Sequence, residues 1–173
     1  MKNNIYIIAF LMIGSLVISC STDYDLNYQN NYEESHKAWL DFKKLSGNSY
    51  QYTVVGSSWT GFRWETTITI LKGEAVERHF KFSDPDDVPD QNVEWIEKGQ
   101  EVGSHQDQAA EALTLDEIYA KAKKEWLIKR ENAKVYFETD YNGLISTCGY
   151  VENGCMDDCF VGIKIKNIER LSP

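Results

Sequence analysis

Three cysteines near the end of the chain have the residue type for a disulfide or a metal site. Cys148, Cys155 and Cys159 are separated by six and then three residues. A structural zinc site needs four ligands and usually a C-x2-C spacing, so this pattern favours a disulfide. Asn153-Gly154 is typical of a two-residue hairpin turn, which would place Cys148 opposite Cys159. We predict a Cys148–Cys159 disulfide with Cys155 free; Cys148–Cys155 is the main alternative.

Aromatic side chains are a second group with a chemical role, because flat rings bind ligands such as sugars with little loss of side-chain entropy. Phe62 and Trp64 alternate with polar residues in step with Ile68, so we assign them to the core. Trp59 lies at an expected turn, and Trp95 lies in a segment without a clear period. Trp59 and Trp95 are therefore the predicted ligand-binding residues.

Acidic residues and histidines give only weak indications of metal binding or catalysis. The segment 83–90 carries four aspartates and would suit Ca²⁺, but it lacks the residue order of an EF-hand. Asp157-Asp158 has no identifiable partner for acid–base catalysis. The three histidines form no H-E-x-x-H motif, and no G-x-S-x-G sequence occurs. We expect no catalytic residue, no metal ion and no cofactor.

Residues 1–19 have the pattern of a secretory signal peptide. Lys2 precedes an apolar run over residues 5–18, which is short for a membrane span. The sequence VISC at its end resembles the lipobox of bacterial lipoproteins, in which the signal peptidase cleaves before a cysteine that carries diacylglycerol. We predict that Cys20 is lipidated and attaches the protein to a membrane of the bacterial cell envelope, with the outer membrane as the expected location.

The charge of the chain narrows the class of partner. The net charge is −9 at pH 7, and a protein of this sign repels the phosphates of nucleic acids. Aromatic residues make up 13% of the chain, which indicates a folded protein rather than a disordered one. We expect no nucleic-acid partner, which leaves a protein or a glycan, in addition to the membrane.

The elements that would position these residues form one domain over residues 33–173. Residues 20–32 are polar and predict a tether, and residues 33–45 predict a helix. Alternation over residues 49–83 predicts a three-stranded antiparallel meander. Thr114-x-x-Glu117 is a capping box that begins a predicted helix over residues 114–132.

A second antiparallel meander is expected over residues 134–168, whereas residues 84–112 contain no clear element. A sheet with one apolar face needs a cover of helices. We therefore predict an α+β fold in which an antiparallel meander sheet, or two such sheets, of about six strands is covered on one face by two helices.

Several short motifs occur at the starts of these elements: Tyr50-Gln51-Tyr52, Lys72-Gly73-Glu74, Leu115-Asp116-Glu117-Ile118-Tyr119, Val135-Tyr136-Phe137-Glu138-Thr139-Asp140 and Asp157-Asp158. Together they resemble a family of small bacterial exported proteins that is known as a domain of unknown function. The resemblance covers roughly residues 36–171. It implies an α+β domain and brings no established activity.

The leading hypothesis is a lipid-anchored, non-enzymatic binding or accessory module of the cell envelope. The first alternative is a hydrolase of envelope or other polymers, and the second is an inhibitor that presents a loop to a partner protein. A pocket that joins Asp157, Asp158 and another carboxylate would favour the enzyme. An aromatic face around Trp59 and Trp95 would favour the binding module.

Overall fold

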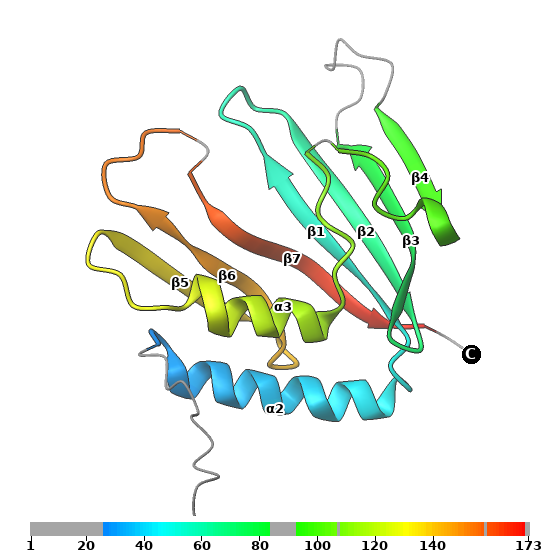
Figure 1. Cartoon of the computed structure of the whole chain (residues 1–173), viewed down its shortest axis with the longest axis horizontal. Helices are drawn as coiled ribbons and strands as arrows, with labels where there is room; N and C mark the ends of the chain where they lie inside the picture. The colour runs from blue at the N-terminus through cyan, green and yellow to red at the C-terminus, as the bar shows by residue number, and fades with distance from the viewer. Residues whose placement is uncertain (1–25, 84–92, 107, 158, 172–173) are drawn as a thin grey trace, which may run out of the picture.

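A single antiparallel sheet of seven strands carries two helices on one face (Figure 1). The computed structural model describes residues 26–83, 93–106, 108–157 and 159–171. The predicted signal peptide, Cys20 and the aspartate-rich segment 84–90 lie outside these residues. The α+β class and the antiparallel sheet are confirmed, but the described residues form seven strands rather than about six. No helix of the described residues is long and apolar enough to cross a membrane.

The strand order across the sheet is β4-β3-β2-β1-β7-β6-β5. The strands are β1 (Tyr50–Ser57), β2 (Arg63–Leu71), β3 (Glu74–Phe82), β4 (Glu94–Lys98), β5 (Ala133–Thr139), β6 (Ile145–Glu152) and β7 (Val161–Arg170). The helices are α2 (Gln29–Leu45) and α3 (Leu115–Lys121). The two predicted meanders are thus two halves of one sheet, joined where the first strand of one half pairs with the last strand of the other.

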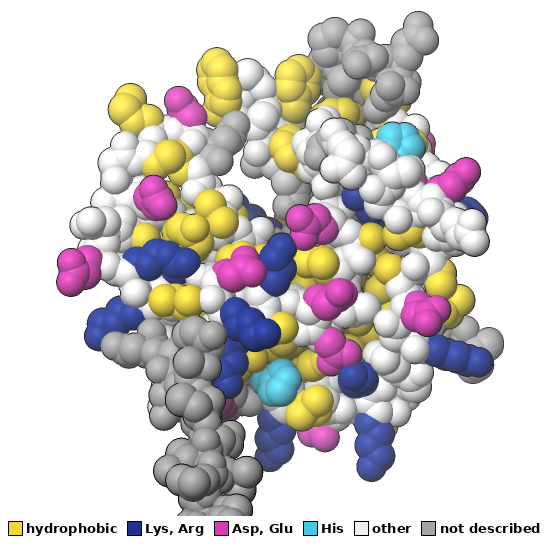
Figure 2. All heavy atoms as spheres, in the orientation of Figure 1, with side chains coloured by type: hydrophobic (Ala, Val, Ile, Leu, Met, Phe, Trp, Pro, Cys, Tyr) yellow, Lys and Arg dark blue, Asp and Glu magenta, His cyan; other side chains and the backbone are white. Residues whose placement is uncertain are grey.

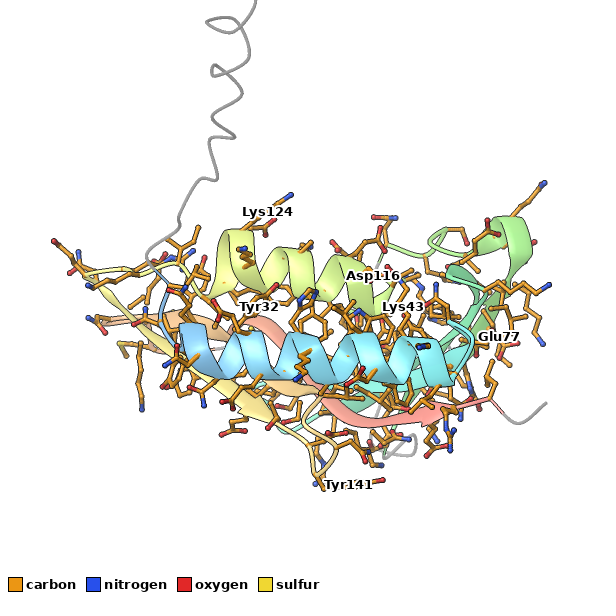
Figure 3. All side chains as sticks on the ribbon, turned by 90° about the horizontal axis from the view of Figure 1, so that it is seen from below. Tyr32, Lys43, Glu77, Asp116, Lys124 and Tyr141 are labelled. Atoms are coloured by element: carbon orange, nitrogen blue, oxygen red, sulfur yellow. A yellow bond between two sulfur atoms is a disulfide. The ribbon has the colours of Figure 1, made fainter. Side chains whose placement is uncertain are left out.

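The first meander follows the alternation of its sequence. One face of β1, β2 and β3 packs under the helices, and its buried residues are Tyr50, Tyr52, Thr66, Ile68, Ile70, Arg78 and Phe80. The opposite face carries threonines and charged residues and is not covered by a helix (Figure 3). Lys72 and Gly73 both have positive φ at the β2–β3 turn, which glycine adopts without strain.

Strand β4 was not predicted, although it pairs with β3 over five residues. Its inward positions are Trp95 and Glu97, opposite Phe80 and Arg78. Because the charged Glu97 lies on the face that the helices cover, β4 lacks the alternation of apolar and polar residues by which a strand is recognised in a sequence. The additional strand therefore explains the difference in strand count.

Helix α2 begins at Gln29, four residues before the predicted start. Leu26 forms a bridge with Ile128, and Tyr32 is 6% exposed with its hydroxyl donating to the Tyr119 carbonyl at 3.2 Å. Figure 3 shows Tyr32 in the space between the two helices. The prediction of a tether over residues 20–32 is therefore wrong from residue 26 onward. Tyrosine rings supply buried area there in a sequence whose polar composition resembles a linker.

Helix α3 begins at the predicted capping box, in which Thr114 accepts from the Glu117 amide and the Glu117 carboxylate accepts from the Thr114 amide. A π-helical turn, Ala122–Trp126, ends it six residues earlier than predicted. The Arg130 side chain donates to the Ile128 carbonyl at 2.9 Å and to other carbonyls at this end. The last carbonyls of the helix therefore accept hydrogen bonds from the Arg130 guanidinium instead of from backbone amides of a further turn.

Asp116 joins the two helices. Its carboxylate accepts from the Trp39 indole at 3.0 Å and lies 2.6 Å from Lys43 Nζ, and Figure 3 shows Lys43 and Asp116 between the helices. Tyr119 lies beneath them, and its hydroxyl accepts from the Ile145 amide at 3.2 Å. Burial raises the pKa of Tyr119 to about 12 against the opposing effect of its hydrogen bonds with Ser35 and Ile145.

The second meander corrects the predicted disulfide. Strand β6 pairs with β7 with Cys148 opposite Ile163, so the connection is a long loop rather than a two-residue turn at Asn153-Gly154. The disulfide joins Cys155 and Cys159 within this loop, with their Cα atoms 6.1 Å apart, and Cys148 is a buried free thiol. The prediction assumed that Met156 and its neighbours form a strand, for which their sequence is poorly suited.

Candidate functional site

The two halves of the sheet part at its centre. Strand β1 pairs with β7 only from Tyr50 to Val54, and a bulge at Lys166 shifts the register between Thr53 and Val54. A bulge bends its strand and increases the local twist. Beyond it, the end of β1 and the start of β7 diverge toward the upper edge in Figure 1. The space between them is a cleft of about 1040 Å³, and Figure 2 shows the molecule notched at this edge.

Trp64 forms an aromatic wall of the cleft on the side of the first meander. It lies directly opposite Gly56 in the β1–β2 pairing. A Cβ atom at Gly56 would collide with the indole ring, so glycine at this position lets the ring lie flat across β1. Phe82 packs edge-on against the ring with centroids 6.2 Å apart, which fixes its orientation.

Phe160 forms the corresponding wall on the side of the second meander. A Cβ atom at Gly149 would collide with the Val161 carbonyl and with this ring, so glycine here permits both the close approach of β7 and the position of the ring. Tyr136 packs against Phe160 with centroids 6.2 Å apart, and Lys164 Nζ lies 4.9 Å from the centre of the Phe160 ring. Two rings over two glycines therefore flank the cleft.

The charged lining of the cleft is mainly cationic in a protein that is acidic overall. Among the described residues, Arg63, Lys164 and Lys166 line it together with the carboxylate of Glu65. Lys166 Nζ lies 2.6 Å from Glu65 Oε1, and Lys81 Nζ lies 3.9 Å from the other oxygen of the same carboxylate. The Glu65 carboxylate is thus neutralised by lysines, and the described lining presents a positive potential to a ligand.

The disulfide borders the cleft through Cys159. Cys159 lines the cleft directly before Phe160, and its partner Cys155 is exposed. Because the Cys155–Cys159 bond restricts the backbone next to Phe160, it helps to hold this ring in place. The thiol of Cys148 takes no part, since it is fully buried, and burial raises its pKa to about 12.

Neither of the predicted ligand-binding tryptophans lines the cleft. Trp59 lies at the β1–β2 turn and is 74% exposed. Trp95 is half-buried, stacked between Phe80 at 5.3 Å and His105 at 4.1 Å between ring centroids. Ligand binding by these two residues stays a prediction, and the structure offers Trp64 and Phe160 instead as aromatic walls. Trp64 was assigned to the core because its position follows the alternation of β2.

Trp95 belongs to a buried polar cluster that fixes the segment after β4. The Arg78 guanidinium lies 4.8 Å from the Trp95 ring centre and forms two hydrogen bonds with Glu97, at 2.9 and 3.1 Å. The Glu97 carboxylate also accepts from the amides of Gly103 and His105, both at 2.6 Å. Burial alone would raise the pKa of Glu97, but these hydrogen bonds outweigh it and hold the pKa well below its ordinary value.

The described lining of the cleft consists mainly of aromatic, cationic and small residues. Within the part of the chain that the structure describes, Glu65 is the one carboxylate that lines the cleft; Asp157 lies exposed outside the lining, and Asp158 lies outside the described residues. Among the described residues, no group of three histidine, cysteine or acidic side chains could hold a metal ion. What the cleft offers is aromatic surface, positive charge and the edges of two strands.

No protein-family model, no curated protein and no solved structure matches the chain. The resemblance to a family of unknown function therefore stays a prediction. The function has to be inferred from the cleft itself. Its sequence signal was the occurrence of Gly56, Gly149 and Gly162 within strands, since glycine in a strand often marks a close approach of other groups.

Proposed function

We propose that this protein is a lipid-anchored, non-enzymatic binding module of the bacterial cell envelope, and that its ligand site is the cleft between β1 and β7. The observation that carries the proposal is the parting of the central strands, which opens about 1040 Å³ bordered by aromatic rings from both halves of the sheet. Ligand sites are typically concave, with apolar walls and a few polar groups that orient the ligand. Trp64 and Phe160 supply the walls, and Arg63 and Lys164 supply the charge.

The hydrolase alternative has less support. Glycoside hydrolysis needs two carboxyl groups on either side of the scissile bond, and other hydrolases need an activated nucleophile. Glu65 has its charge engaged by Lys166 at 2.6 Å, and Cys159 is in a disulfide. Binding without catalysis therefore accounts for this lining with fewer assumptions.

The anchor would hold the domain close to a membrane, with the cleft at the opposite edge of the sheet from the start of α2 (Figure 1). If Cys20 carries the lipid, only residues 21–25 separate it from Leu26, the first residue that the structure describes. Five residues reach at most about 20 Å when fully extended. A module attached by so short a connection would bind ligands that are present at the membrane surface.

Backbone amide NMR with three probe ligands tests the proposed site. The probes are an oligogalacturonate as an acidic glycan, cellohexaose as a neutral glycan, and an octapeptide of alternating glutamate and valine. We expect at least one probe to shift the amides of Gly56, Trp64, Gly162 and Lys164. The same samples, analysed by mass spectrometry after incubation, should contain no cleavage products.

The matched control uses two lysines with similar surroundings. Lys164 lies over Phe160 at the cleft, and Lys134 lies over Tyr136 away from it, both with Nζ 4.9 Å from the ring centre. Lys164→Glu should weaken the shifts, whereas Lys134→Glu should leave them unchanged. If no probe shifts the cleft amides, or if the shifts gather elsewhere, the proposed site is wrong. Probe cleavage would favour the hydrolase.

A further inference from the structure

We infer that the ligand of the cleft is an extended acidic peptide segment, which pairs as an added strand with the edge of β1 or β7. This inference rests on the proposed function, because it names the ligand class of the same cleft. The inference also goes beyond the proposed function, since the cleft alone would equally suit a small anion or an acidic glycan. Three features of the cleft support a peptide.

The first feature is the pair of strand edges. Among the described residues, no strand pairs with β1 on the β7 side beyond Val54, nor with β7 on the β1 side before Ile165. Backbone donors and acceptors at such an edge form a ready site for an additional strand. Extended peptides bind proteins in this way, through main-chain hydrogen bonds along an exposed sheet edge.

The second feature is the length of these edges. On one side the edge runs from Val55 to Ser57, and on the other from Val161 to Lys164. Four residues of a strand extend about 13 Å at ~3.3 Å per residue. The cleft therefore accommodates a short extended segment of about this length, and a longer peptide would continue past the open edge of the sheet.

The third feature is the separation of charge and apolar surface between the two sides of the sheet. Trp64 lies on the helix-covered face, because it shares that face with the buried residues of β2. Lys164 and Phe160 lie on the opposite face, together with Tyr136. Successive side chains of a strand point to opposite faces. A peptide with alternating acidic and apolar residues would place its carboxylates near Lys164 and Lys166 and its apolar side chains near Trp64.

Fluorescence anisotropy with a fluorescein-labelled octapeptide of alternating glutamate and valine tests the inference on the full chain. The peptide should bind, and binding should weaken as salt rises from 50 to 500 mM, because salt screens the lysine contacts. The same peptide with every backbone nitrogen methylated keeps its carboxylates but loses its strand donors. We expect it to bind at least about tenfold more weakly. A lysine–valine octapeptide should not bind.

Two variants connect the binding to the cleft. Lys164→Ala should weaken binding of the acidic peptide about two- to fivefold, as expected for one partly exposed ion pair. Lys134→Ala, whose lysine lies over a ring outside the cleft, should bind like the unmodified protein. Equal binding by both variants would overturn the assignment of the peptide to this cleft.

The outcomes separate the inference from the proposed function. Equal binding of the normal and the methylated peptide would show that charge alone attracts the ligand, and would overturn strand addition. Binding of oligogalacturonate at the cleft without binding of the peptide would also overturn the inference, while the cleft would remain a binding site. Failure of every probe to reach the cleft would overturn both.

Discussion

Glu97 shows how one buried carboxylate determines the course of a long connection. Its side chain is 1% exposed, and it accepts hydrogen bonds from Arg78 on the neighbouring strand and from Gly103, Ser104 and His105 on the segment that follows. Without these partners, a buried carboxylate would be strongly unfavourable. The pair of Arg78 and Glu97 therefore orders the segment that crosses the sheet toward α3, including Gln108 and Ala110 at the cleft.

Glu97→Gln should destabilise the protein by roughly 3–5 kcal/mol at pH 7, because it leaves the Arg78 charge buried without a counterion. The pKa of Glu97 is lowered from 4.5, so its stabilising contribution is complete above this pH and is lost as the pH falls through the lowered pKa. The difference in unfolding free energy between the two proteins should therefore shrink toward pH 2. Urea unfolding of both proteins at pH 7 and at lower pH measures this difference in unfolding free energy.

Glu94→Gln is the matched control, since Glu94 pairs with His79 at 2.7 Å but is 57% exposed. Its effect should stay below about 1 kcal/mol, as for other exposed pairs. If both substitutions cost the same, the Glu97 cluster does not stabilise the fold in the way described.

The cysteines should react according to their burial. At pH 8 iodoacetamide should leave Cys148 unmodified in the folded protein and label it in urea, because burial raises its pKa and excludes the reagent. Digestion before aspartate and glutamate, which cuts at Glu152 between Cys148 and Cys155 and at Asp157 between Cys155 and Cys159, should release two peptides joined by the Cys155–Cys159 disulfide and leave the Cys148 peptide unlinked. Peptide mapping without reduction shows both the labelling of Cys148 and the peptides that the disulfide joins. A linked pair of Cys148 and Cys159 would restore the pairing predicted from the sequence, and a linked pair of Cys148 and Cys155 would restore its main alternative.

At the scale of elements, the start of α2 belongs to the folded domain. Asn27 donates to the Leu127 carbonyl at 2.8 Å, and Tyr32 lies buried against Tyr119. A chain that begins at Glu33 loses these contacts. It should therefore unfold at a lower urea concentration than a chain that begins at Cys20, by the equivalent of about 3–5 kcal/mol for a large aromatic side chain.

A chain that begins at Leu26 provides the control for this truncation, because it lacks the preceding residues but keeps every described contact of α2. It should unfold like the chain that begins at Cys20. Equal stability of the chain that begins at Glu33 would support the original prediction of a tether up to residue 32.

Much of the fold was predictable where a strand has one buried and one solvated face. The alternation around Ile68 and the capping box at Thr114 predicted the first meander and the start of α3, because local sequence and tertiary packing agree there. Strand β4 was not predictable in this way, since Glu97 is buried by partners distant in sequence. The cleft depends on the bulge at Lys166 and on pairing between strands far apart in the chain, which no local pattern reveals.

At the scale of the whole molecule, the proposed anchor and the cleft have separate tests. Cys20→Ala should abolish incorporation of a fatty-acid probe and leave the precursor uncleaved, because stable anchoring requires the acylated cysteine. Ser21→Ala, which changes the next residue, should be processed and labelled normally. Labelling experiments in a lipoprotein-producing bacterium measure this. Fatty-acid incorporation by the Cys20→Ala protein would contradict the lipoprotein proposal.

The parting of the sheet between β1 and β7 underlies the proposed function, and cross-strand NOEs in the free protein test it most directly. We expect backbone NOEs that connect β1 with β7 from Tyr50 to Val54, in the register that pairs Tyr52 with Ile168. None should connect Val55–Ser57 with Val161–Lys164. NOEs that continue along β1 as far as Ser57, opposite Gly162, would show a closed sheet without a cleft and would contradict the account.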